Sequence, residues 1–308
     1  MEKLFTENFK SVNTDKELKE LQEQCKEYDP AYITQSAGVP RKHIKEWLEK
    51  LWQQYEPYAD NDFPKKIKKE FNQRTWEMYL ACTLLDRGFS LKERKNRRNK
   101  GPDICLVVEN KNIWTEAVTT NVGKGNDKVE IHCDKDIQHI RAYDYPEEQI
   151  LLRLRNALDS KFQKHKDYLK NVIKESEPYI IAVNAGKLLA LNPGIPLILK
   201  CLFSIGFLTI PIHNEKPRTP FWSKREELKK KSGSSVSMGF FENPEYSCVS
   251  AVVYCADDIL NSPEDKNTMG DNFVFVLNPL AKNKIEEKLF NFGQVWKKGN
   301  DKIVNLRN

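Results

Sequence analysis

The spacing of apolar residues changes several times along this chain, and each change predicts a different element. Over residues 14–60 apolar side chains recur at helical spacing, with breaks at Asp29-Pro30 and at Gly38-Val39-Pro40. A further helix is predicted over residues 64–86, where the same spacing includes Trp76. The chain therefore opens with amphipathic helices, and residues 14–60 are expected to form a helical extension.

Three short extended runs follow this helix. They cover residues 89–93, 103–108 and 113–119, and the turn Glu109-Asn110-Lys111-Asn112 separates the last two. The last two runs are predicted to form a hairpin. Residues 120–146 are polar and interrupted by glycine, which indicates a long loop or insertion.

A long helix and a buried strand come next. Apolar residues from Ile150 to Leu169 keep helical period, which predicts a helix over residues 146–175 that Pro178 closes. Residues 179–183 form a continuous apolar run and are expected to be a buried strand.

The order of elements over residues 64–184 is therefore helix, strand, strand, strand, helix, strand. This order describes an α/β core. Further strands are predicted over residues 205–212, 247–254 and 272–277, with a charged helix over residues 223–231. We expect the further strands to extend the same sheet.

Composition adds limits to this picture. The chain has 308 residues, is 39% hydrophobic and 31% charged, and carries a net charge of +6, which suits a globular protein and is compatible with a polyanionic partner. Its seven cysteines include no CxxC pair, which predicts a reduced, cytoplasmic setting. The N-terminus lacks a signal-peptide pattern, and prolines interrupt the apolar stretch at residues 188–212, so no membrane span is expected.

Two carboxylates mark the predicted hairpin as the candidate site. Asp103 begins one strand and Glu116 lies within the next, thirteen positions later. Such a pair, with the Ala117 carbonyl as a third oxygen ligand, could hold the hard divalent cation that phosphodiester hydrolysis requires. Glu77, on the preceding helix, could bind the metal directly or hold a metal-bound water. The alternative is that these are ordinary carboxylates at strand ends.

The residues around these acids resemble the PD-(D/E)xK superfamily. Pro102-Asp103 looks like its PD, Glu116-Ala117-Val118 looks like its (D/E)xK, and Glu77 corresponds to an acid often found on the helix. More narrowly, Trp114–Val118 and the segment that follows are similar to a group of bacterial nuclease-like proteins of unassigned role. The resemblance implies the restriction-endonuclease-like fold, a mixed sheet flanked by helices in the order α-β-β-β-α-β.

This resemblance suggests three parts for the chain. Residues 1–62 would be the N-terminal helical extension, and residues 63–215 a PD-(D/E)xK-like nuclease core. Residues 216–308 would be a strand-rich C-terminal extension packed on that core.

Val118 departs from the family's pattern, because it stands where the family has its catalytic lysine. An apolar side chain can neither orient the attacking water nor offset charge in the transition state. A relocated cation could replace the lysine. Arg153 and Lys161 fall on one stripe of the long helix, and Lys124 lies in a glycine-flanked loop. Such cations could equally be solvated or paired in salt bridges.

A basic segment precedes Asp103. With Lys124 it makes the candidate nucleic-acid-binding set, which is Lys92, Arg94, Lys95, Arg97, Arg98, Lys100 and Lys124. Cations at the mouth of a metal site would attract a phosphate backbone independently of sequence. The segment could also be only a solvated loop.

These observations favour a Mg²⁺-dependent or Mn²⁺-dependent endonuclease that acts on DNA in preference to RNA. Asp103, Glu116, Ala117 and Glu77 would form the metal site, and Arg153 or Lys161 would supply the displaced cation. The alternative is a catalytically inactive module of the same fold that binds nucleic acid or a protein partner. A homodimer is compatible with either function.

Overall fold

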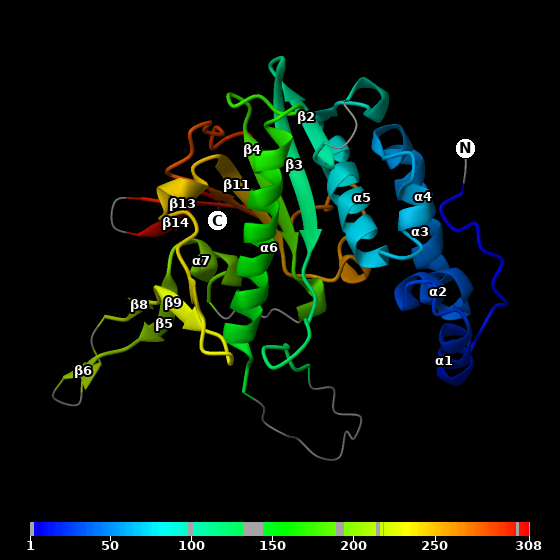
Figure 1. The fold of residues 1–308 in the computed structure, drawn as a ribbon, viewed down its shortest axis with the longest axis horizontal. Coiled ribbons are helices and arrows are strands. Elements are labelled where there is room, and N and C mark those ends of the chain that lie inside the picture. The colour runs from blue at the N-terminus through cyan, green and yellow to red at the C-terminus, as the bar shows by residue number, and fades with distance from the viewer. Residues whose placement is uncertain are drawn as a thin grey trace.

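The protein is built around one mixed sheet of eight strands with helices on both of its faces (Figure 1). The computed structural model describes residues 3–97, 101–131, 144–188, 194–213, 216–217, 219–299 and 302–307. The strands, in their order across the sheet, are β1 (Ser90–Leu91), β2 (Ile104–Val108), β3 (Lys111–Thr119), β4 (Tyr179–Asn184), β11 (Val249–Cys255), β12 (Val274–Leu277), β13 (Gln294–Lys298) and β14 (Ile303–Asn305). The pairs β3/β4, β4/β11 and β12/β13 are parallel, and the other four pairs are antiparallel.

Both faces of the central strands are apolar, because each face is covered by helices. Along β4, Ile180 and Ala182 belong to the core shared with α5 (Phe71–Asp86). Ile181 and Val183 belong to the opposite core, shared with α6 (Glu147–Tyr168) and α7 (Leu197–Leu202). A strand buried on both faces has a continuous apolar sequence, as residues 179–183 do.

Four helices precede α5 along the chain. They are α1 (Asp15–Gln24), α2 (Pro30–Ala37), α3 (Lys42–Tyr55) and α4 (Phe63–Lys66). The rings of Trp47 on α3 and Tyr79 on α5 meet edge to face with centroids 5.9 Å apart. The ring of Trp52 on α3 stacks on that of Phe63, with centroids 5.2 Å apart. Residues 1–62 therefore contribute side chains to the core on the α5 face of the sheet.

One aspartate links the start of α2 to the start of α5. Asp29 precedes Pro30 as the N-cap of α2, and its Oδ1 accepts a hydrogen bond from the Ala31 amide at 2.8 Å. Its Oδ2 accepts a second from the Phe71 amide at 3.2 Å, where α5 begins. Capping oxygens satisfy amides that have no partner within their own helix.

The predicted α/β core is confirmed, since α5, β1, β2, β3, α6 and β4 follow each other in the expected order. The expected helix over residues 64–86 is divided into α4 and α5. The expected helix over residues 146–175 ends at Tyr168, and residues 169–177 form turns before β4.

Two predictions beyond residue 184 were wrong. Residues 223–231 contain no helix, but belong to β8 (Phe221–Lys224) and β9 (Glu227–Lys229). Leu228 is the only apolar residue of that charged segment, and it is buried between exposed neighbours, which is the period of a strand. The strand expected over residues 205–212 exists as β5 (Ile205–Thr209), but it pairs with β8 outside the main sheet.

Three small two-stranded sheets complete the fold within the described residues. They are β5/β8, β9/β10 with β10 at Ser235–Ser237, and β6/β7 at Ile212–His213 and Lys216–Pro217. The expected C-terminal extension supplies β11 to β14, which belong to the main sheet. The strands expected near residues 247–254 and 272–277 therefore do extend that sheet. In the described part of the chain, no helix is long and apolar enough to cross a membrane.

Shared packing makes the stability of residues 1–62 depend on the sheet. Leu48 on α3 is fully buried in the core that α5 covers. Leu48→Ala should lower the free energy of unfolding by about 2–5 kcal/mol, because it removes buried methyl groups and leaves a cavity. Chemical denaturation followed by circular dichroism measures this. A separate, earlier transition confined to the N-terminal helices would contradict the shared core.

Candidate active site

The hairpin of β2 and β3 places Asp103 opposite Glu116. Glu109 and Asn110 at its tip both have positive φ, as a tight two-residue turn requires, and this turn sets the strand register. Ile104 pairs with Thr115, so Asp103 and Glu116 face each other one step further along. The Ala117 amide donates a hydrogen bond to Asp103 Oδ2 at 2.8 Å. The structure thus brings the two predicted acids together.

Glu116 points toward α6 and is almost completely buried, with 1% of its surface exposed. Its Oε1 accepts hydrogen bonds from Lys161 Nζ at 2.8 Å and Lys164 Nζ at 3.0 Å, and its Oε2 accepts one from the Tyr168 hydroxyl at 2.9 Å. Burial opposes ionisation, but the two ammonium groups outweigh it and lower the pKa of Glu116. Glu116 is therefore held as a carboxylate.

The three partners of Glu116 follow one stripe of α6, at spacings of three and four residues. Lys161 is buried, with 10% of its side chain exposed, whereas 51% of the Lys164 side chain is exposed. Burial and the adjacent Glu116 carboxylate raise the pKa of the Tyr168 hydroxyl, so Tyr168 remains a hydrogen-bond donor at neutral pH. Lys161 is thus enclosed by the protein, whereas Lys164 also contacts solvent.

The pKa of Asp103 is shifted in the opposite direction to that of Glu116. Burial raises its pKa well above the usual range, and the nearby charges of Glu116 and Glu77 raise it further. The charge of Lys161 lowers it, but less strongly. Within the described residues no salt bridge neutralises Asp103. This is the group in the site whose ionised form a bound cation would most stabilise.

Glu77 is held by its own partners on α5 and α3. The Tyr55 hydroxyl donates a hydrogen bond to Glu77 Oε1 at 2.5 Å, and Arg74 Nη1 contacts Glu77 Oε2 at 2.6 Å. Burial raises the pKa of Glu77, although Arg74 and Tyr55 oppose that effect. Both carboxylate oxygens of the predicted helix acid are therefore engaged by protein groups.

Gln73 connects α5 to the end of β3. Its Nε2 donates a hydrogen bond to the Ala117 carbonyl at 3.1 Å, and its Oε1 accepts one from the Thr119 amide at 2.9 Å. The Ala117 carbonyl keeps one lone pair that this bond does not use.

A divalent cation fits the donor set in part. Asp103, Glu116 and the Ala117 carbonyl supply only oxygen atoms, which Mg²⁺ prefers, and the described residues form no salt bridge with Asp103. No group of three or more His, Cys, Asp or Glu side chains suited to a metal ion occurs among the described residues. The structure therefore does not gather Glu77 with the other two acids into a three-carboxylate site.

Of the three cations considered as replacements for the motif lysine, Lys161 contacts Glu116, whereas Arg153 and Lys124 form no hydrogen bond or ion pair with it among the described residues. Arg153 Nη2 donates a hydrogen bond to the Asp127 carbonyl at 2.8 Å. Its guanidinium occupies the space where a Cβ on Gly123 would be, and Gly123 has a φ of +76°. Arg153 therefore fastens the loop after β3, and Lys124 is exposed in that same loop.

Several side chains of the basic segment before Asp103 form hydrogen bonds or ion pairs with other groups of the protein. Arg97 Nη1 donates hydrogen bonds to the carbonyls of Pro102 and Asp103, at 3.1 Å and 2.7 Å, so it shapes the backbone at the start of β2. Arg94 pairs with Asp60. The Lys95 side chain is 76% exposed and pairs with Glu93.

The remaining candidate cations of this segment are Lys92, Arg98 and Lys100. The Lys92 side chain is half-buried. Arg98 and Lys100 lie outside the described residues. Fewer of these cations therefore face solvent than the sequence led us to expect.

Several residues contribute to the site without having been predicted from the sequence. They are Tyr55, Gln73, Arg74, Lys164 and Tyr168. A signal existed for two of them, because Lys164 and Tyr168 continue the helix stripe that includes Lys161. The role of Tyr55 had no such signal, since it depends on how α3 packs against α5.

Fold and site together define an α/β protein with a helix-flanked mixed sheet and two neighbouring acids, one just before β2 and one within β3. Comparison of the chain with protein-family models, curated proteins and solved structures gave no match.

The raised pKa of Asp103 predicts a cost in stability. A folded-state pKa above the unfolded value of about 3.9 means that stability falls as pH rises from that value through the folded pKa. Asp103→Asn, measured in EDTA, should therefore melt at a higher temperature than the wild type at pH 8. The difference in stability between the variant and the wild type should shrink as the pH falls toward 4. It should change by up to about 1.4 kcal/mol for each pH unit between the folded and unfolded pKa values of Asp103.

Asp167→Asn is the matched control, because the Asp167 side chain is 73% exposed. Its melting temperature should stay close to that of the wild type at every pH. Equal or lower stability of Asp103→Asn at pH 8 would show that Asp103 carries no electrostatic cost.

Proposed function

We propose that this protein is a Mg²⁺-dependent endonuclease with the restriction-endonuclease-like fold, hydrolysing phosphodiester bonds in DNA. The observation that carries the proposal is the contact between Lys161 and Glu116 at 2.8 Å. In the PD-(D/E)xK pattern a lysine two positions after the acid works beside it, and here Val118 occupies that position. Lys161 brings an ammonium group to the same acid from α6.

Asp103, Glu116 and the Ala117 carbonyl would hold the Mg²⁺, or Mn²⁺ in its place. The chemistry that the cation supplies when bound is neutralisation of the phosphate and acidification of a water molecule. Glu77 would act indirectly, because its charge raises the pKa of Asp103 while Arg74 and Tyr55 hold its own oxygens.

Three residues of α6 would have different roles in the reaction. Lys161 is buried against Glu116, so its ammonium can orient a water beside the acid and offset negative charge as it develops. Lys164 is half exposed, which lets it contact a phosphate oxygen of the substrate as well as Glu116. Tyr168 fixes the second oxygen of Glu116 and stays protonated.

DNA is the proposed substrate class. Lys95 and Lys124 are exposed cations on the segments that precede Asp103 and follow β3 in the sequence, and such cations attract a phosphate backbone without reading its bases. DNA is preferred to RNA on the resemblance to restriction-endonuclease-like proteins.

One observation favours a second function, a catalytically inactive module that binds nucleic acid or a protein partner. Both oxygens of Glu116 already receive hydrogen bonds, two of them from ammonium groups. A carboxylate neutralised in this way needs no metal ion.

Cleavage of supercoiled plasmid with Mg²⁺ or Mn²⁺ tests the main proposal. The wild type should nick or linearise the plasmid, and EDTA should stop it. Asp103→Ala and Glu116→Gln should each lower the rate at least ~100-fold, because each removes an oxygen ligand at the reacting centre. Undamaged DNA and RNA of every form, together with salt-sensitive DNA binding that survives Glu116→Ala, would support the inactive module instead.

Lys161 and Arg153 were both expected as replacements for the motif lysine, and single variants separate them. Lys161→Ala should lower kcat by ~10²-fold or more, a typical cost for losing a group that transfers protons or stabilises charge. Arg153→Ala should change kcat far less, since Arg153 contacts the loop after β3.

Lys166→Ala is the control on the same helix, because the Lys166 side chain is 51% exposed and pairs weakly with Glu245 at 3.8 Å. Its kcat should match the wild type. Adding Val118→Lys to Lys161→Ala should recover part of the lost rate by returning an ammonium group to the motif position. A Lys161→Ala variant with full activity would overturn the assignment.

A further inference from the structure

A two-stranded arm projects from the body of the protein. β5 and β8 are antiparallel, with Leu208 opposite Trp222 and Thr209 opposite Phe221. The chain continues outward from this ribbon into β6 and β7, and Figure 1 shows the arm extending away from the main sheet. Two-stranded ribbons without a third strand or a packed face have little stability of their own in water.

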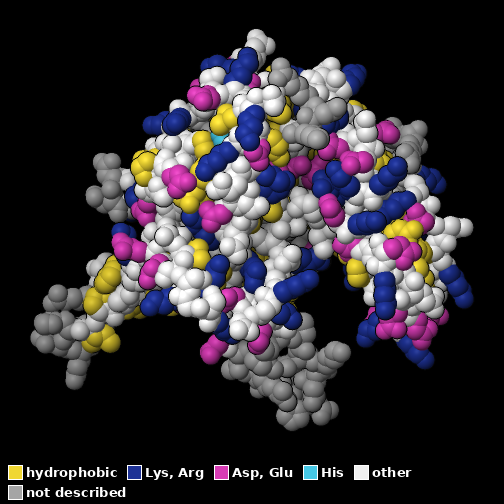
Figure 2. Space-filling model, viewed as in Figure 1, with side chains coloured by type: hydrophobic (Ala, Val, Ile, Leu, Met, Phe, Trp, Pro, Cys, Tyr) yellow, Lys and Arg dark blue, Asp and Glu magenta, His cyan; other side chains and the backbone are white. Residues whose placement is uncertain are grey.

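The arm is unusually apolar for a surface element. Five of the eight large hydrophobic side chains exposed in the described residues belong to it, and Figure 2 shows hydrophobic side chains along its length. Their exposed fractions are Phe207 61%, Leu208 51%, Ile210 53%, Ile212 74% and Phe221 52%. Phe207 and Leu208 are consecutive on β5, close to a shift in its register with β8, and both side chains are exposed.

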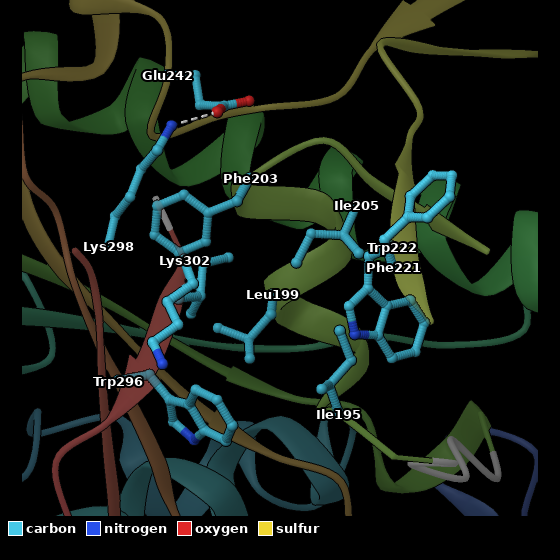
Figure 3. A pocket seen from close by; sticks show the side chains of 11 residues that line it. Ile195, Leu199, Phe203, Ile205, Phe221, Trp222, Glu242, Trp296, Lys298 and Lys302 are labelled. Carbon is cyan, nitrogen blue, oxygen red and sulfur yellow. Dashed lines mark hydrogen bonds and ion pairs between the residues drawn. The ribbon is translucent and has the colours of Figure 1, made fainter. Parts of the chain in front are cut away.

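An apolar cavity lies beside the arm. It has a volume of about 460 Å³, and its walls include Leu199 and Phe203 from the body and Trp296 from β13 (Figure 3). Phe221 and Trp222 of β8 also line it, so the cavity and the arm form one continuous apolar surface.

Three charged side chains line the cavity, and two of them pair with each other. Lys298 and Glu242 pair at 2.6 Å and neutralise each other, as the dashed line in Figure 3 marks. The third charged side chain of the lining is Lys302.

We propose that the arm and the cavity are the two halves of an interface between two copies of this chain. A two-fold interface requires one surface that is complementary to itself, and this chain carries an apolar projection next to an apolar hollow. When two arms lie side by side in antiparallel orientation, the outer end of each reaches the cavity of the other. Ile212 of one copy then enters the cavity lined by Trp296 of its partner.

The dimensions of the arm fit this arrangement. Ile205 and Ile212 are seven residues apart, a reach of about 23 Å for extended chain. Large apolar side chains bury roughly 150–250 Å² each when fully covered, so the exposed parts of five such side chains amount to roughly 500 Å² per arm. Two arms therefore contribute roughly 1,000 Å², and the cavity walls that they cover bring the total to about 1,200 Å², the lower limit for a specific interface.

The molecular mass in solution tests the proposal. Light scattering after size exclusion, at micromolar concentration, should give about twice the 36.0 kDa of one chain. Ile212→Lys should raise the dissociation constant of the dimer at least ~100-fold, because it places an ammonium group in an apolar cavity whose lining already includes Lys302. The side chain of Ile212 is 74% exposed, so the monomer should fold and melt as the wild type does.

Leu280→Lys is the matched control, since Leu280 is exposed at 41% but lies outside the arm. It should remain dimeric. A wild type that is monomeric throughout, or a dimer that Ile212→Lys leaves unchanged, would overturn the proposal. So would an arm that binds lipid vesicles or another protein while the chain stays monomeric.

Cross-linking tests the antiparallel arrangement. Ile212→Cys protein mixed with Ile195→Cys protein should form a covalent dimer with a short bismaleimide, because Ile195 lines the cavity. Ile212→Cys alone should cross-link no more than the wild type with its native cysteines. Efficient cross-linking of Ile212→Cys to itself would place the two outer ends together and contradict the arrangement.

Discussion

The buried carboxylate of Glu116 constrains the whole site. An unpaired buried charge costs several kcal/mol, so the fold must bring cations to it. Lys161 and Lys164 do this from α6, and Tyr168 completes the set. The Tyr179 hydroxyl donates a hydrogen bond to the Lys161 carbonyl at 3.0 Å, which ties the same turn of α6 to β4. These contacts fix the position of α6 along β3, and with it the position of the candidate catalytic lysine.

Asp103 and Glu116 are neighbours whose environments move their pKa values in opposite directions. Glu116 has cations beside it, whereas burial and the charges of Glu116 and Glu77 act on Asp103. Paired acids separated in this way are typical of sites where one group must remain charged and another must respond to a ligand. The N-terminal helices take part, because Tyr55 on α3 holds Glu77. The helical extension thus supports the site as well as the core.

Local pattern predicted the hairpin, the pair of acids and the order of elements up to β4, because short-range periodicity and turn residues determine these features. It also predicted Lys161 as a replacement cation, but it could not separate Lys161 from Arg153. That choice depends on the rotation of α6 and on Gly123, which leaves room for the Arg153 guanidinium. The strands around Leu228 were mistaken for a helix because their charged residues have high helix propensity, while their structure is decided by strand pairing, of β9 with β10 across a short turn and of β8 with β5.

The proposed divalent-cation site consists of Asp103 and Glu116 and is completed by Lys161. Electron paramagnetic resonance of Mn²⁺ added to the purified protein measures binding at this site, since bound and free Mn²⁺ differ in signal. We expect saturable binding by the wild type, loss of binding in Asp103→Asn and Glu116→Gln, and competition by Mg²⁺. A folded wild type that binds no Mn²⁺, with or without DNA, would rule out the site.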